Sequence, residues 1–400
     1  MGKLKLIITL LFFTMVVWAQ QSELRYPKLS EDAEVSIIVC GPSHDAAFTL
    51  YGHAAIRVKD NSKNLDNIFN YGLFDFNGEN FIYRFVKGET DYKLGVANFL
   101  DYIVEYRMRG SYASELVLNL SAEEKNRIWE ALLENYRPEN RVYRYNFFFD
   151  NCSSRLLYIV ESNIDGKILF DENQPVHTFR DLINDCTKEH LWLTFGCDLV
   201  LGSPTDRAAT IHEKMFLPEF LEKFFITGVI QLPDGTTKPL VRQTISLSEF
   251  NPKINNYAGE PLTPLFCSIV LMVLIVVITI VGYRHNKYYR LIDCALFFVA
   301  GIAGIVVFFV SFISEHPCVY PNWNIVWLHP LHLVGFVLFF VKKLKTAANY
   351  YHFINFAVLT LLLVGWHFIP QHMNMAFIPL VITLWVRSFY AVSRVKKNKD

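Results

Sequence analysis

Apolar and polar residues are distributed differently along the two halves of the chain. After Pro261 come five apolar stretches, each about 17–23 residues long, which is the length that crosses a bilayer. These stretches are Leu262–Gly282, Leu291–Ile313, Ile325–Val341, Phe353–Ile369 and Met375–Val392. Before Pro261 the apolar residues occur in short runs separated by Gly, Asn, Asp and Pro. The pattern therefore predicts a soluble domain followed by a bundle of five transmembrane helices.

The short runs of the first half predict an α+β fold, in which a small antiparallel sheet packs against helices. Strands are expected where β-branched and aromatic residues dominate: Val35–Cys40, His53–Lys59, Asn67–Tyr71, Phe81–Val86 and Glu115–Leu120. Helical periodicity and capping residues predict helices at Asn98–Arg109, from Ser121 to Tyr136, after Asn151, and at Val176–Cys186 and Pro218–Phe225. Residues 20–245 form the predicted domain, 246–261 a linker and 262–400 the membrane domain.

The N-terminus and the loop charges predict which way the protein faces. Lys3 and Lys5 precede the apolar run Leu6–Trp18, and Val17 and Ala19 fit a cleavage site, so residues 1–19 read as a secretory signal. An uncleaved anchor is the alternative. Lys and Arg gather after the first and third apolar stretches and in the C-terminal tail, whereas 314–324 and 370–374 hold none. Because cytoplasmic loops carry the excess of Lys and Arg, residues 20–261 are expected outside and the C-terminus inside.

Charge and composition exclude several classes of protein. The chain has 38 basic and 38 acidic residues and is 52% hydrophobic and 19% charged. Most of the charges lie before Pro261, which argues against a wholly cytosolic enzyme and a disordered chain. The balance of charge also argues against a polybasic nucleic-acid binder.

The exported half contains four cysteines: Cys40, Cys152, Cys186 and Cys197. Exported cysteines are usually paired, so disulfides are expected. Cys186 and Cys197 are close enough in sequence to pair, and Cys40 could replace either. Cys152 differs because Asp150 or Asn151 is a good N-cap, which puts Cys152 in the first turn of a helix. The positive end of the helix dipole there stabilises a thiolate, the nucleophilic form of cysteine.

A thiol nucleophile needs a base, and His53 is the strongest candidate. It begins a predicted strand directly after Gly52, so the strand can present it to a helix terminus. His44 and His190 are interpreted as surface or core residues. His329 and His332, near the outer end of an apolar stretch, are interpreted as part of an interfacial belt of rings. Their helical spacing is compatible with a metal site, but no Asp or Cys pattern supports one, and no metal is predicted.

Four ordered blocks resemble the lipoprotein N-acyltransferase family of Bacteroidota (Lnb). The segment Gly52–Val58 resembles the family's GHxAIRV block, and Tyr145–Arg155 (YNFFFDNCSSR) resembles its block around an Asp-Asn-Cys motif. Gly196–Arg207 and Met215–Pro218 resemble two further blocks. The resemblance covers roughly residues 35–225, and four blocks in order are far more specific than one motif.

This resemblance implies a periplasmic, papain-like domain in which the histidine precedes the cysteine, on a multi-pass protein of the bacterial inner membrane. It implies Cys152 as nucleophile and His53 as base, with Asn70 on the next strand orienting the imidazole and Asn151 shaping the turn. Asp198, Asp206 and Arg207 are interpreted as a buried charge pair, or else as contacts to the substrate amine.

The implied reaction transfers an acyl chain, through a Cys152 thioester, to the α-amine of a diacylated lipoprotein. The donor is a phospholipid or the lipoprotein's own glyceryl ester, and no cofactor is required. The alternatives are a membrane-anchored cysteine peptidase or amidase, a phospholipase, and a non-enzymatic binding domain with Cys152 in a disulfide.

Overall fold

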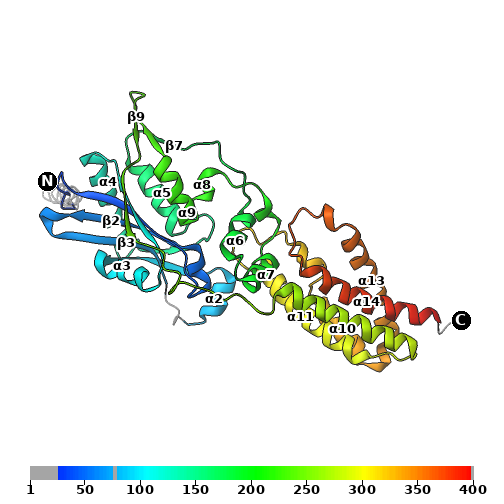
Figure 1. Ribbon diagram of the computed structural model, residues 1–400. Coiled ribbons are helices and arrows are strands. Elements are labelled where there is room, and N and C mark those ends of the chain that lie inside the picture. Colours follow the sequence, from blue (N-terminus) through cyan, green and yellow to red (C-terminus); the bar gives the residue numbers. More distant parts are fainter. Residues whose placement is uncertain (1–25, 75–78, 398–400) are drawn as a thin grey trace, which may run out of the picture.

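A computed structural model describes residues 26–74 and 79–397. The predicted signal, residues 1–19, lies outside the described residues. The molecule is elongated, with an α+β part at the N-terminal side and a bundle of long helices at the C-terminal side (Figure 1). The region of short apolar runs and the region of long apolar stretches thus fold as two distinct parts of one chain.

A seven-stranded antiparallel sheet forms the centre of the first part. Its strand order is β10-β5-β1-β2-β3-β4-β6. The strands are β1 (Glu34–Cys40), β2 (His53–Asp60), β3 (Leu65–Leu73), β4 (Asp91–Asn98), β5 (Ala113–Leu118), β6 (Val142–Arg144) and β10 (Val241–Ser248). A small second sheet consists of β7 (Lys167–Leu169), β8 (Val229–Gln231) and β9 (Thr237–Pro239).

Helices cover both faces of the large sheet. On one face α4 (Ala122–Tyr136), α5 (Cys152–Asn163) and α9 (Pro218–Thr227) bury the main core, and on the other α3 (Phe99–Met108) buries a smaller one. Strand β2 shows the alternation, because Ala54 and Ile56 belong to the main core and Ala55 to the smaller one. This burial on both faces explains why the central strands contain almost no exposed positions.

One predicted strand is wrong. Residues Phe81–Val86 lie in a helix, α2 (Phe81–Lys87), which buries none of its residues inside the protein. Asn80 and Gly88 bound it in the left-handed region (φ 55° and 82°), and the Gly88 N–H closes the last turn on Arg84 and Phe85. Aromatic content favours strands where a sheet is available for packing, and at this position the side chains have no sheet to pack on.

Several elements were not predicted from the sequence: β4, β6, the second sheet, α7 (Leu191–Val200) and β10. Strand β10 pairs with β5 and ends at Ser248, so the sheet extends into the segment 246–261 that was predicted to be linker. The remaining helices of this part are α6 (Phe179–Thr187) and the short α8 (Ile211–Lys214).

The membrane part contains α10 (Pro264–Arg284), α11 (Arg290–Phe312), α12 (Leu331–Phe340), α13 (Lys345–Val364) and α14 (Phe377–Lys397). Within the described residues, four segments are long and apolar enough to cross a membrane: Pro264–Arg284, Arg290–Phe312, Trp323–Phe340 and Lys342–Val364. Helix α14 packs against α10 and α13, and its crossing of the membrane stays a prediction. Its fully buried Arg387 donates to Asp293 of α11 at 2.6 Å, so the charge is paired inside the bundle.

Helix α7 joins the two parts. It contacts α10 and α11, and Asn324, from the segment between α11 and α12, donates to the carbonyl of Asp198 at 3.0 Å. We call this segment and the one between α13 and α14 the outer loops, because both are hydrogen-bonded to the α+β part. Gly202, just after α7, donates its N–H to the carbonyl of Cys318 at 2.8 Å. The α+β part is therefore hydrogen-bonded to the outer loops of the helical bundle.

The polar block around α7 is structural. Arg180 is buried and donates to Asp198 at 2.9 Å and to Asp206 at 2.7 Å. Asn374, from an outer loop of the bundle, donates to the same Asp198 carboxylate at 2.9 Å. Arg207 is not part of this cluster, because it pairs with Glu213 at the surface. The predicted buried charges are thus present, but their cation is Arg180.

One of the two histidines assigned to the interfacial belt, His332, differs from the prediction. His332 is fully buried, stacks on His329 with ring centroids 4.0 Å apart and forms a hydrogen bond with the carbonyl of Trp327 at 2.9 Å. It lies inside the bundle, not in a belt of rings at the interface.

Candidate active site

Asn151 fixes the start of helix α5. Its side-chain oxygen accepts hydrogen bonds from the N–H groups of Ser153 and Ser154 at 3.0 and 2.9 Å. Its side-chain nitrogen donates to the carbonyls of Phe147 and Phe216 at 2.9 and 2.7 Å. Asn151 therefore satisfies two orphan amides of the helix and anchors the preceding turn. Cys152 follows as the first residue of α5.

His53 lies where strands β2 and β3 separate. The pairs between them run from Asp60↔Leu65 to Ile56↔Phe69, so the ladder ends before it reaches His53. The His53 ring nitrogen Nε2 lies 2.6 Å from the Oδ1 of Asn70 on β3. An Nε2–H donated to Asn70 holds the ring in one orientation and leaves Nδ1 for another partner.

Cys152 lies next to the same imidazole. The N-terminus of α5 packs on β2, and the Cys152 thiol forms a hydrogen bond with His53. Gly72, which follows the end of the ladder, has a φ of 105°. A Cβ at Gly72 would lie 3.5 Å from His53 Cε1 and 3.8 Å from Cys152 Cβ. These are ordinary contact distances, so glycine is favoured here by the positive φ of its backbone, and the position borders both side chains.

The surroundings favour an ion pair between the two groups. Burial on its own would raise the pKa of the Cys152 thiol, but His53 and the N–H of Ala54 lower that pKa below its ordinary value. Burial on its own would lower the pKa of His53, but Cys152 and the hydrogen bond with Asn70 raise it. Both shifts favour thiolate and imidazolium, the reactive state of a Cys–His dyad.

The N-terminus of α5 can also stabilise an oxyanion. The side chain of Asn151 caps Ser153 and Ser154, which leaves the Cys152 N–H outside that cap. An N–H at a helix N-terminus, aligned with the dipole, is suited to stabilise the negative oxygen of a tetrahedral intermediate. The arrangement can therefore generate a thiolate and stabilise the product of its attack on a carbonyl.

Three tyrosines near the thiol were missed by sequence reasoning. Tyr92, Tyr143 and Tyr145 all lie close enough to Cys152 for a thiolate to raise their pKa values, although burial is the larger cause. The rings of Tyr92 and Tyr145 stack with centroids 4.1 Å apart. Tyr92, Tyr143 and Cys152 belong to the same buried cluster, and Tyr145 packs against it. The aromatic run before Cys152 was the available signal, but Tyr92 reaches the site from an unpredicted strand.

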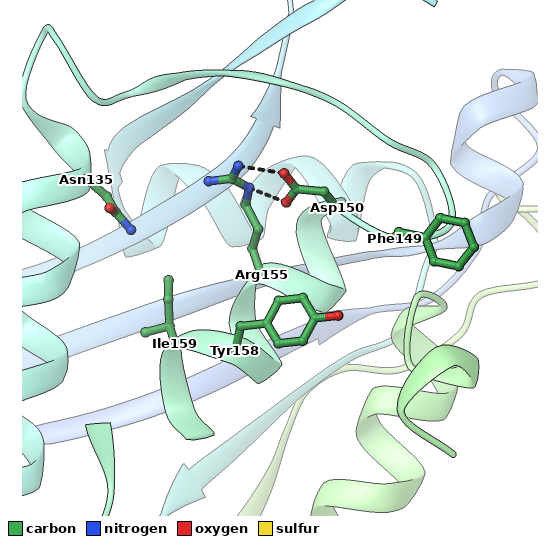
Figure 2. Close-up of a pocket in the computed structure, with 6 residues that line it drawn as sticks. All are labelled: Asn135, Phe149, Asp150, Arg155, Tyr158 and Ile159. Carbon is green, nitrogen blue, oxygen red and sulfur yellow. Dashed lines mark hydrogen bonds and ion pairs between the residues drawn. The ribbon is translucent and has the colours of Figure 1, made fainter. Parts of the chain in front are cut away.

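A hollow of about 450 Å³ opens on a neighbouring part of α5. Figure 2 shows Arg155 and Asp150 turned toward one another there, with hydrogen bonds of 2.6 and 2.8 Å. Its lining consists of Asn135, Phe149, Asp150, Arg155, Tyr158 and Ile159. The Arg155 guanidinium lies 3.5 Å from the centroid of the Tyr143 ring. The hollow is thus adjacent to the tyrosines but is not lined by Cys152 or His53.

The expected disulfides are not present. Every cysteine of the described residues is a free thiol, including Cys40, Cys186 and Cys197. Burial raises the pKa values of Cys186 and Cys197 to about 12 and about 11, so both stay protonated at neutral pH. Among the described residues no group of three His, Cys, Asp or Glu side chains is placed to hold a metal ion.

Comparison with known proteins gives two matches, one for each part of the chain. Residues 30–185 match the model of the Lnb N-terminal periplasmic domain, and residues 255–399 match that of the Lnb transmembrane domain. No curated protein and no solved structure matches the chain. The two matches follow one another in the order of the two structural parts, and the first includes Cys152, His53, Asn70 and Asn151.

Proposed function

This chain belongs to the Lnb family and is a membrane protein of the lipoprotein N-acyltransferase type, and we propose that its Cys152 carries the acyl chain. The proposed domain is papain-like, with the histidine before the cysteine in sequence. The proposed acceptor is the α-amine of the S-diacylglyceryl cysteine of a lipoprotein. The reaction takes place at the outer surface of the inner membrane and needs no cofactor.

In the first step His53 holds the proton of the Cys152 thiol, and the thiolate attacks the carbonyl carbon of a fatty-acyl ester. The N–H at the start of α5 stabilises the resulting oxyanion. The carbon–oxygen bond to glycerol breaks, and the leaving oxygen takes the proton from His53. The acyl chain is then bound to Cys152 as a thioester.

In the second step the lipoprotein amine attacks the thioester carbonyl. His53 accepts a proton from the amine, the carbon–sulfur bond breaks, and the product is an amide. Asn70 keeps the imidazole oriented in both steps. A thioester suits this acceptor because its carbonyl is reactive toward amines, provided that water is excluded. The tyrosines beside Cys152 are suited to that exclusion.

One observation carries the proposal. The Cys152 thiol lies at a helix N-terminus, has a lowered pKa and is hydrogen-bonded to His53, and the Nε2 of His53 lies 2.6 Å from the Oδ1 of Asn70. The attached membrane domain adds to it. A peptidase would need only a single anchor, whereas this chain has at least four segments of spanning length and composition. A lipid donor explains why the soluble part is fixed to such a bundle.

The test replaces Cys152 by Ala in the full chain, expressed in a strain with no other N-acylation of lipoproteins. Lipoprotein N-terminal peptides are then analysed by mass spectrometry. We expect N-acylation with the unaltered chain and none with Cys152→Ala. Cys40→Ala is the matched control, since it also removes a buried thiol, and it should retain N-acylation.

Normal N-acylation by Cys152→Ala would contradict the proposal. If the unaltered protein released free fatty acid and no acylated lipoprotein, it would be a phospholipase. If it cleaved peptides, it would be a peptidase or amidase. Phospholipids with deuterated acyl chains separate the two donors: a deuterated amide indicates phospholipid, and an unlabelled one indicates the glyceryl ester of the lipoprotein.

A further inference from the structure

Helix α2 presents apolar side chains away from the protein. Ile82, Tyr83 and Phe85 are 78%, 55% and 47% exposed, and none of the seven residues of the helix is buried. The charged side chains of the helix are held by the protein: Arg84 donates to Asp91 at 3.1 Å, and Lys87 pairs with Glu89. An apolar surface whose neighbouring charges are already paired is suited to an apolar environment.

The contacts of α2 place this surface beside the end of a transmembrane helix. The ring of Tyr83 lies 6.0 Å from that of Phe309, one turn inside the end of the transmembrane helix α11. The loop that follows α11 is hydrogen-bonded to the end of α2, because Glu315 donates its N–H to the carbonyl of Lys87 at 2.7 Å. The His316 ring also forms a hydrogen bond with the carbonyl of Phe85 at 2.7 Å. Because Phe309 lies inside an apolar helix of spanning length, we expect side chains beside it to lie at the level of the acyl chains of the outer leaflet.

A continuous series of rings connects α2 to the candidate active site. The ring of Phe85 stacks on Phe81, and Phe81 stacks on Phe74, with centroids 5.9 and 6.2 Å apart. Phe74 contacts Tyr92 at 4.8 Å, and Tyr92 stacks on Tyr145 at 4.1 Å. Tyr92 lies in the same buried cluster as Cys152, and Tyr145 packs against that cluster. We call these five rings the aromatic ladder.

We propose that α2 is immersed in the outer leaflet and that the acyl chain of the donor lipid reaches Cys152 along the aromatic ladder. This inference rests on the proposed function and adds to it the place where the lipid enters. The occupant is a fatty-acyl chain because the ladder is apolar and because it begins at the level of the bilayer. A water-soluble substrate would have no need of a path that starts there.

The test compares two acyl donors on the same full-length protein, reconstituted in vesicles of phosphatidylethanolamine and phosphatidylglycerol. The first donor is the vesicle phospholipid, and the second is p-nitrophenyl butyrate, a short soluble ester. The measured quantity is the ratio of the two rates of Cys152 acylation. In the variant Ile82→Asn/Phe85→Asn we expect this ratio to fall at least about tenfold, because both substitutions weaken contact with lipid.

Leu100→Asn is the matched control. Leu100 is 65% exposed and lies in the first turn of α3. Helix α3 follows the Asn98 end of β4, whereas α2 precedes the Asp91 end. Its ratio should equal that of the unaltered protein. An unchanged ratio in the Ile82/Phe85 variant would overturn the inference, even if both rates fell together. Failure of the unaltered protein to acylate Cys152 with either donor would instead overturn the proposed function itself.

Discussion

Two thiols near the same end of strand β2 have pKa values shifted in opposite directions. Cys40 is the cross-strand partner of His53 and is fully buried, and Cys152 on the other side of the sheet is 7% exposed. Burial strongly raises the pKa of Cys40, whose sulfur lies 3.9 Å from the Tyr102 hydroxyl in the small core against α3. The pKa of Cys152 is lowered although burial opposes it.

The difference shows which features lower the pKa of a cysteine. Proximity to His53 in the sheet does not suffice, since Cys40 is paired with it in register and stays a thiol. Cys152 has three features that Cys40 lacks: the N-terminus of a helix, a hydrogen bond with the imidazole, and the N–H of Ala54. Each of them stabilises the thiolate.

The largest expected effect separates the two cysteines. Cys152→Ala should lower the rate of lipoprotein N-acylation by at least about 10⁴-fold, because loss of a nucleophile removes the chemical step. Cys40→Ala should leave the rate within about twofold and cost roughly 1 kcal/mol of stability for the lost atom. Initial rates in vesicles and thermal unfolding of both variants measure this contrast. Equal losses of rate would contradict it.

Removal of the imidazole should make Cys152 resemble Cys40. In His53→Ala the pKa of Cys152 should rise, because its main stabilising partner is lost, and N-acylation should slow by about 10²–10⁴-fold. The rate of alkylation of Cys152 by iodoacetamide as a function of pH measures the pKa directly. The idea fails if the alkylation profile of Cys152 is the same with and without His53.

Activity should depend on pH with two limbs. The acid limb follows formation of the thiolate, which begins below the ordinary pKa of cysteine, and the alkaline limb follows loss of the imidazolium, above the ordinary pKa of histidine. The apparent values belong to the pair. Since Asn70 raises the pKa of His53, Asn70→Ala should move the alkaline limb to lower pH. It should also reduce kcat/KM by about tenfold, less than loss of the base.

A full profile of kcat/KM against pH for the Asn70→Ala protein makes this measurement, with Asn70→Gln as the conservative comparison. A lower rate with an unmoved alkaline limb would mean that Asn70 supports only the fold.

The smallest effect is expected on the Cys40 side. Tyr102→Phe removes the hydroxyl beside Cys40 and should change the free energy of unfolding by no more than about 1 kcal/mol. It should not alter N-acylation or the alkylation of Cys152, because Tyr102 lies on α3, across the sheet from α5. Denaturant unfolding and the acylation assay check both statements. A change in the alkylation profile of Cys152 would show that the two sides of the sheet are coupled.

The sequence was informative where a local pattern has a local cause. The cap at Asn151, the thiol that follows it and the strand that begins at His53 are set by neighbouring residues, and the structure has all three. The membrane-spanning helices are likewise predictable from the long apolar stretches, because the thickness of the bilayer fixes their length. The family resemblance added Asn70, which the structure brings to within 2.6 Å of the His53 ring.

The features that were missed depend on distant partners. Phe81–Val86 has the composition of a strand, but among the described residues it has no neighbouring strand to pair with and lies as a helix beside α11. Arg180 acquires its role from Asp198 and Asp206, which are 18 and 26 residues further along. Tyr92 reaches Tyr145 through the pairing of β4 with β6. The disulfide expectation followed from the exported location, and it was wrong: Cys186 and Cys197 pack against the same hydrophobic cluster, yet both are free thiols, as is Cys40.

The most direct test of the account is to locate the acyl chain on the protein. The full-length protein is incubated in phospholipid vesicles without a lipoprotein acceptor, digested at acid pH and analysed by mass spectrometry. We predict an acyl mass on the peptide that contains Cys152, released by neutral hydroxylamine as a thioester should be, and none on the peptide that contains Cys40. N-acylation of lipoproteins by a protein whose Cys152 never carries an acyl chain would contradict the account.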